Sequence, residues 1–78
     1  MTTSTTQIYI GGLRDEIEAD DLKYEFKRFG TISEFNFKGR CAFIEYEDPA
    51  GASAAVKDMD GATIGRSSVR LTVEHARK

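Results

Sequence analysis

Two aromatic residues, Tyr9 and Phe43, stand at the centre of short runs in which they alternate with aliphatic side chains. Residues 8–10 read IYI and residues 42–44 read AFI. Successive side chains of a β-strand point to opposite faces of the sheet, so each ring lies on the face opposite to its aliphatic neighbours. If the aliphatic side chains face the core, both rings are exposed. Exposed rings can stack against unpaired nucleobases, and each stacked base contributes about 1–3 kcal/mol.

The other residues with reactive side chains do not form a catalytic or metal-binding group in the sequence. The chain has one cysteine, Cys41, and one histidine, His75, so it offers no thiol pair and no Cys/His ligand cluster. One histidine beside an open sheet does not make a credible Ser/His/Asp triad. We therefore expect no enzymatic activity, no cofactor and no metal. Cys41 is interpreted as a small spacer on the aromatic surface, where a third ring would strengthen stacking.

Polar and basic residues near the two rings are candidate contacts for a nucleic acid. Asn36 should point to the open face and could bond a base edge, unless a bulge shifts its register. Lys38 and Arg40 flank a turn and could supply positive charge. His75 is expected just after the last strand, either as a base contact or as a solvent-exposed spectator, and both readings stay open. Three further cations either contact phosphates or are simply solvated, namely Arg70, Arg77 and Lys78.

Charge is unevenly distributed along the chain. The formal net charge is −2, which mildly disfavours nucleic acid as a partner. Residues 14–25 hold two basic and six acidic residues, a net charge of −4, whereas residues 66–78 hold four basic residues and one acidic residue, a net charge of +3. The acidic segment is most simply explained as the solvated surface of a helix, which leaves another face free to meet phosphate. It could instead dock a basic protein.

The hydrophobic pattern predicts an α+β domain with the element order βαββαβ. Strands are expected at residues 7–10, 31–37, 41–46 and 69–74, with a tight turn at residues 38–40 between the second and the third. The spacing of Leu22, Phe26 and Phe29 predicts a helix over residues 19–29, which Gly30 ends. Asp48 as the N-cap and Pro49 at the first helical position predict a second helix, which ends at residues 60–61.

Two helices can cover only one face of a four-stranded antiparallel sheet, so the expected fold is a ferredoxin-like sandwich with one open face. We expect a flexible leader over residues 1–6, a domain over residues 7–76 and a tail at residues 77–78. The phenylalanines at positions 26, 29, 35 and 37 are expected in the core, and Tyr24 and Tyr46 are expected to be packed. The strand residues expected to point into the core are Ile8, Ile10, Ala42, Ile44, Leu71 and Val73.

This set of motifs resembles the RNA-recognition motif family. Residues 8–13 (IYIGGL) are similar to the first-strand signature of that family, and residues 42–46 (AFIEY) match the end of its third-strand signature. The start of the third-strand signature departs from the family. Gly39, Arg40 and Cys41 stand where a basic residue, a glycine and an aromatic residue are usual, which leaves two rings instead of three. The resemblance extends over residues 7 to about 75.

Within the family, residues 45–49 (EYEDP) and the short turn look most similar to the serine/arginine-rich (SR) splicing factors. The resemblance implies binding of single-stranded RNA in pre-mRNA splicing or mRNA processing. It also implies a nuclear protein, with or without shuttling to the cytoplasm, whose partners include other processing proteins and no membrane. The domain is expected to be monomeric and part of a longer protein. The alternative is a protein-interaction module of the same fold with weak or no RNA binding.

Overall fold

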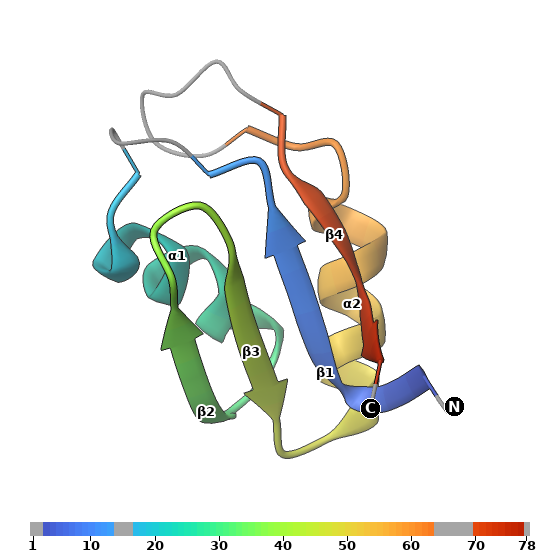
Figure 1. Cartoon of the computed structure of the whole chain (residues 1–78). Coiled ribbons are helices and arrows are strands. Elements are labelled where there is room, and N and C mark those ends of the chain that lie inside the picture. Colours follow the sequence, from blue (N-terminus) through green and yellow to red (C-terminus); the bar gives the residue numbers. More distant parts are fainter. Residues whose placement is uncertain (1–2, 14–16, 64–69, 78) are drawn as a thin grey trace.

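Four strands and two helices follow one another in the predicted order in a computed structural model, which describes residues 3–13, 17–63 and 70–77 (Figure 1). The strands are β1 (Thr3–Gly11), β2 (Ile32–Phe37), β3 (Ala42–Tyr46) and β4 (Thr72–Arg77). The helices are α1 (Ala19–Phe26), extended by a short 3-10 turn, η1 (Lys27–Phe29), and α2 (Pro49–Met59). The βαββαβ order that the sequence predicts is therefore confirmed.

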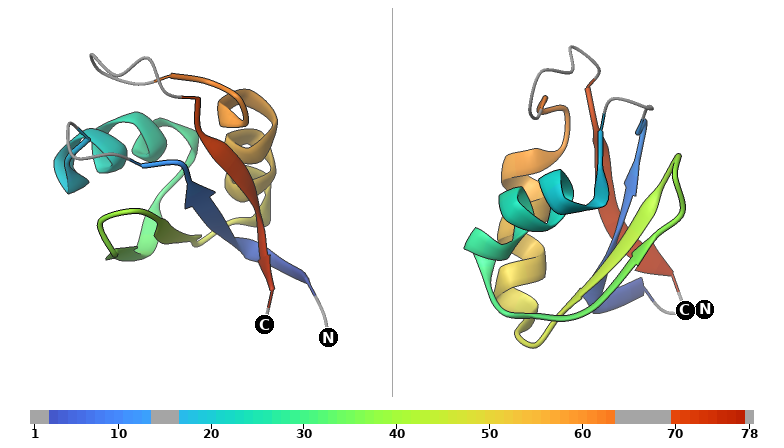
Figure 2. Two further views of the ribbon diagram at one scale, coloured as in Figure 1. Left: turned by 45° about the horizontal axis from the view of Figure 1, so that its top comes forward. Right: turned by 90° about the vertical axis from the view of Figure 1, so that its left-hand side faces the viewer.

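The strands form one antiparallel sheet in the order β2-β3-β1-β4. Both helices lie on the same side of this sheet, as the right-hand view of Figure 2 shows. No helix or loop among the described residues covers the other side, which we call the open face. This is the ferredoxin-like arrangement that the sequence predicts. Within the described residues, no helix combines the length and the apolar character that crossing a membrane requires.

The core lies between the sheet and the two helices. Leu22 and Phe26 of α1 are fully buried, and so are Ala52 and Ala55 of α2. The alternation predicted for the strands is confirmed, since all six residues expected to point inward are at most 2% exposed: Ile8, Ile10, Ala42, Ile44, Leu71 and Val73. Phe29, Phe35 and Phe37 are partly buried against this core, which agrees with their expected side of the sheet.

Local hydrogen bonds explain where the helices begin and end. At the start of α1, the Glu18 amide donates to the Asp21 carboxylate at 3.2 Å, and the acidic first turn suits the helix dipole. At the start of α2, the Asp48 carboxylate accepts from the Ala50 amide at 2.9 Å, with Pro49 next to it. Both starts agree with the sequence analysis. The buried Tyr46 hydroxyl donates to the Phe26 carbonyl at 2.6 Å, which ties the end of α1 to β3.

Two strands, β1 and β4, differ from their predicted ranges by more than one residue. β1 begins at Thr3, so residues 3–6 belong to a strand and not to a flexible leader. β4 runs from Thr72 to Arg77 instead of over residues 69–74. Leu71 does not join the ladder, because it pairs with the turn after α2: its carbonyl accepts from the Gly61 amide at 2.7 Å, and its amide donates to the Ala62 carbonyl at 2.8 Å. The start of the predicted strand, Val69, lies outside the described residues.

Candidate nucleic-acid interface

Four side chains lie in one row across the open face, one from each strand. Tyr9 of β1 has Phe43 of β3 as its Cα partner on one side and Glu74 of β4 on the other. Phe43 in turn has Asn36 of β2 as its partner. Directly opposite residues of an antiparallel pair share a face, so Asn36, Phe43, Tyr9 and Glu74 form a continuous row. We call this the platform row.

The two rings at the centre of the row contact each other. Their centroids are 5.5 Å apart and their planes are inclined by 60°, an edge-to-face arrangement that aromatic pairs favour. Both rings are half-buried, although no described helix covers them, because each shields part of the other. Inclined planes cannot stack on one flat base together. The pair is therefore suited to two successive bases, one against each ring.

Gly11 makes room for the Tyr9 ring. The ring extends along β1 over Gly11, so that a Cβ atom at this position would lie 2.8 Å from the Tyr9 hydroxyl oxygen and 2.9 Å from the ring carbon Cε2. Both distances are shorter than any ordinary contact. The glycine that follows the IYI run thus allows the ring to lie along the sheet surface, a role that the sequence analysis did not assign to it.

The polar ends of the platform row are exposed. Asn36 points outward between the half-buried Phe35 and Phe37, as predicted. The irregularity in β2 lies between Ile32 and Glu34, upstream of Asn36, so it does not change this orientation. Glu74 is exposed and free of any hydrogen-bond partner among the described side chains. Alternation predicts that Glu74 points outward, but only the strand register places it beside Tyr9.

The turn between β2 and β3 lies beside the platform row, since it connects the strand of Asn36 with the strand of Phe43. Lys38, Gly39 and Arg40 are exposed, and Gly39 has a φ of +90°, a conformation that favours glycine. The Lys38 amide donates to the Cys41 carbonyl at 2.8 Å, which closes the turn. Cys41 directly precedes β3 and is half-buried. Lys38, Arg40 and Cys41 therefore lie close to Phe43 along the chain, at the edge of the platform row.

Two of the remaining predicted contacts, Arg70 and His75, are not brought to the platform row. Arg70 precedes β4, and its guanidinium donates to the Gly61 carbonyl in the turn after α2 at 3.4 Å. His75 lies inside β4 and not after it, because the strand continues to Arg77. It is the Cα partner of the fully buried Ile8, so its side chain is on the helix side, where its Nδ1 atom is buried without a hydrogen-bond partner. The side chain of Arg77 and the whole of Lys78 lie outside the described residues.

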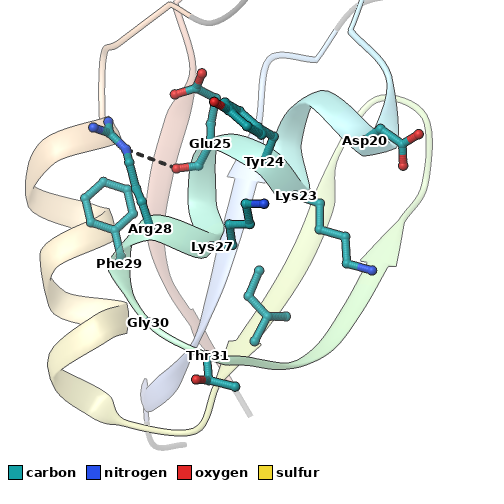
Figure 3. Close-up of a pocket in the computed structure, with 10 residues that line it drawn as sticks. Asp20, Lys23, Tyr24, Glu25, Lys27, Arg28, Phe29, Gly30 and Thr31 are labelled. Carbon is teal, nitrogen blue, oxygen red and sulfur yellow. Dashed lines mark hydrogen bonds between the residues drawn. The ribbon is translucent and has the colours of Figure 1, made fainter.

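A second surface involves a tyrosine that was expected to be packed. Tyr24 of α1 is 67% exposed, since it lies two residues from the buried Leu22 and so points away from the core. It borders a groove between α1, η1 and the start of β2, which we call the α1 groove (Figure 3). The Lys27 ammonium lies 5.1 Å from the centre of the Tyr24 ring. The groove is also lined by Asp20, Lys23, Phe29 and Ile32.

Side chains that could ligate a metal are scattered in the described part of the chain. Among residues 3–13, 17–63 and 70–77, no three side chains of His, Cys, Asp or Glu gather as they would around a metal ion. Burial raises the pKa of the Tyr46 hydroxyl, but this side chain is a core residue that bonds a backbone carbonyl. The open face offers two rings as stacking surfaces and the exposed polar groups of Asn36 and Glu74.

Known proteins match most of the length of this chain. Serine/arginine-rich splicing factor 5 of Homo sapiens is 36% identical over 74 residues, covering 95% of this chain and 26% of the relative. The RNA-binding protein spenito of Drosophila melanogaster is 40% identical over 76 residues, covering 95% of this chain and 10% of the relative. Polyadenylate-binding protein RBP47 of Nicotiana plumbaginifolia is 34% identical over 73 residues, covering 90% of this chain and 17% of the relative. The chain therefore spans only a minor part of each of these proteins.

Solved structures share the fold. A chain of a structure described as "SXL-lethal protein/RNA complex" superposes with a TM-score of 0.85 at 25% identity, covering 96% of this chain and 50% of that chain. The RNA15 RRM superposes with a TM-score of 0.83 at 20% identity, covering 96% of this chain and 92% of that chain, and it supports the fold alone. The family model described as "RNA recognition motif" matches residues 8–70, which is well over half of the sequence. The chain belongs to the RNA recognition motif family.

Proposed function

We propose that this chain binds single-stranded RNA on its open face, with one base stacked on Tyr9 and the next on Phe43. The observation that carries the proposal is the contacting pair of rings, 5.5 Å apart on a face that no described helix covers. Both rings fall within the region that the family model matches. Asn36 would bond a base edge, and Lys38 and Arg40 would meet phosphates at the adjoining turn. The proposed activity is binding without catalysis.

The cellular role is part of the same proposal. Relatives that are named as splicing and polyadenylate-binding proteins support a function in pre-mRNA splicing or mRNA processing, and hence a nuclear location. We propose that the domain that extends from β1 to β4 acts as a monomeric RNA-binding unit. Binding by this unit alone is expected to be weak, because two rings stack fewer bases than three and because the net charge of −2 disfavours phosphate.

A titration with short single-stranded RNAs, followed by backbone amide chemical shifts, tests this proposal. The shifts are expected to concentrate on β1 and β3. Tyr9→Ala and Phe43→Ala should each weaken binding by about fivefold to 150-fold, because each removes one stacking surface. Tyr24→Ala is the matched control, since it removes an exposed tyrosine from the helix side. Shifts that are absent from β1 and β3, or an equal loss in Tyr24→Ala, would contradict the proposal.

A protein-interaction module is the second candidate, and the exposed Tyr24 favours it. A basic polypeptide could place an apolar side chain beside Tyr24 and its cations against the exposed Asp20 and Asp21 at the front of α1. Tyr24→Ala combined with Asp20→Asn would then abolish capture of such a partner, while binding of RNA stayed intact. The Tyr9→Ala and Phe43→Ala variants would show the opposite pattern, so the two candidates are separable.

A further inference from the structure

The Glu74 carboxylate forms one end of the platform row. Glu74 lies directly opposite Tyr9 on the edge strand β4, it is exposed, and no described side chain bonds to it. Glu45, the other open-face carboxylate close to the rings, differs in this respect, because it accepts a hydrogen bond from the Thr6 hydroxyl at 2.9 Å. Glu74 is thus an open-face carboxylate beside Tyr9 that no described side chain already holds.

Directly opposite residues of an antiparallel pair have Cβ atoms only about 5 Å apart. A base that stacks on the Tyr9 ring would therefore have its edge within reach of Glu74, whose two methylene groups carry the carboxylate above the sheet surface. Glu74 ends the row on the edge strand, and the other exposed β4 side chain beside the ring is Thr72, the Cα partner of Gly11, which carries no charge. Of these two neighbours, Glu74 is the carboxylate, so it is the charged group that a base stacked on Tyr9 would meet on the β4 side.

We propose that Glu74 selects the base on Tyr9 and that it favours guanine and disfavours uracil. The inference rests on the proposed function, since it assigns a preference to the same surface. An ionised carboxylate can only accept hydrogen bonds, with two oxygen atoms side by side. Guanine presents two adjacent donors, its ring N1–H and its exocyclic amino group, and both can bond one carboxylate. Uracil presents a single N–H between two carbonyl oxygens, which the carboxylate repels.

Cytosine and adenine fall between these extremes. Each offers one exocyclic amino group that a carboxylate can accept from, next to ring or carbonyl acceptors that it cannot bond. The other end of the row should be less selective, because the Asn36 amide both donates and accepts. The structure thus assigns discrimination to the Tyr9 subsite and tolerance to the Phe43 subsite.

Short oligouridines of about eight nucleotides, with one interior position changed, provide the test. The protein can slide along such a strand until the changed base lies on Tyr9, so the binding register need not be known. Replacing one uracil by guanine should strengthen binding by about fivefold to 150-fold, the range expected for a good bidentate contact. Replacing it by hypoxanthine, which lacks the amino group of guanine, should recover only part of this gain.

The Glu74→Ala and Glu74→Gln variants show whether the carboxylate is responsible. In both variants the ratio of affinities for the guanine-containing and the all-uracil strands should fall towards one, while the affinity for the all-uracil strand should not decrease. An unchanged ratio in Glu74→Ala would overturn the inference, and so would the lack of a guanine preference in the wild type. If no strand binds, or if Tyr9→Ala leaves binding unchanged, the proposed function itself fails.

Discussion

At the scale of single residues, the space above Gly11 controls where the Tyr9 ring lies. Gly11→Ala places a methyl group within 2.9 Å of the ring, which must then turn away from its position beside Phe43. Gly11 does not have a positive φ, so the strand itself tolerates alanine. We expect RNA affinity to fall by about fivefold or more, as part of one stacking contact is lost. The free energy of unfolding should change by less than about 1 kcal/mol.

A double-mutant cycle is the control for this prediction. If Gly11→Ala acts through the ring, then it should cost almost nothing in a chain that already carries Tyr9→Ala. RNA affinities of the four proteins, measured by chemical-shift titration, give the coupling. An equal loss with and without the Tyr9 ring would mean that Gly11 contributes to binding in another way.

Substitution of Cys41 allows the opposite test, in which an aromatic ring is added to the open face. It directly precedes β3 and, by alternation, shares the face of Phe43 two residues further on. Cys41→Phe should strengthen RNA binding by up to about 1–3 kcal/mol, whereas Cys41→Leu, which adds bulk without a π-face, should not. Titration of both variants decides the matter. Unchanged affinity with an intact fold would show that bases do not pass over this position.

At the scale of elements, the Tyr46 hydroxyl joins β3 to the end of α1. Tyr46→Phe leaves the Phe26 carbonyl without this 2.6 Å bond, so we expect the free energy of unfolding to fall by about 1–2 kcal/mol in urea titrations at neutral pH. Tyr24→Phe, on the exposed face of the same helix, should have no such effect. A loss as large in Tyr24→Phe would contradict the role given to the buried bond.

Burial also makes this junction sensitive to alkaline pH. Because burial raises the pKa of Tyr46 above its ordinary value of 10.0, the folded chain keeps a proton that the unfolded chain releases. Stability from this group is complete below pH 10 and falls as the pH rises further, by at most about 1.4 kcal/mol per pH unit. Urea titrations between pH 8 and about 11 should show this extra loss in the wild type but not in Tyr46→Phe.

Most elements could be predicted from the sequence because their limits have local causes. Asp48 and Pro49 set the start of α2, and Gly30 closes the turn that follows α1. The start of β4 could not be predicted, since alternation through Leu71 fits a strand as well as the observed pairing with the turn after α2. The length of β1 does not follow from the β-branched Thr5 and Thr6 alone, because a polar, repetitive segment also fits a flexible leader.

The candidate site was predictable only in part, for a related reason. Period-two alternation gives the face of Tyr9, Phe43 and Asn36, and all three lie on the open face. Alternation does not say which residues of different strands lie opposite each other. That register depends on the irregularity between Ile32 and Glu34 in β2 and on where β4 begins, both of which are tertiary features. The sequence therefore predicts only that Glu74 points outward, and the strand register is needed to place it opposite Tyr9.

At the scale of the whole molecule, charge limits how strongly RNA is held. The net charge is −2, and the described cations nearest the platform row are Lys38 and Arg40, both exposed in the turn before β3. Each phosphate contact to single-stranded RNA contributes about −0.7 to the slope of log affinity against log salt concentration. With two to three contacts, we expect a slope of about −1.4 to −2.

Removing these two cations tests whether the contacts lie where the fold places them. Lys38→Ala combined with Arg40→Ala should make the slope shallower by about 1.4, because two phosphate contacts are lost. The exposed Lys57 of α2, on the helix side of the sheet, provides the control: Lys57→Ala should leave the slope unchanged. Affinities measured at several salt concentrations for the three proteins give the slopes. If the double variant keeps the wild-type slope, the phosphates run elsewhere, and the strand must cross the open face in a direction that avoids the turn before β3.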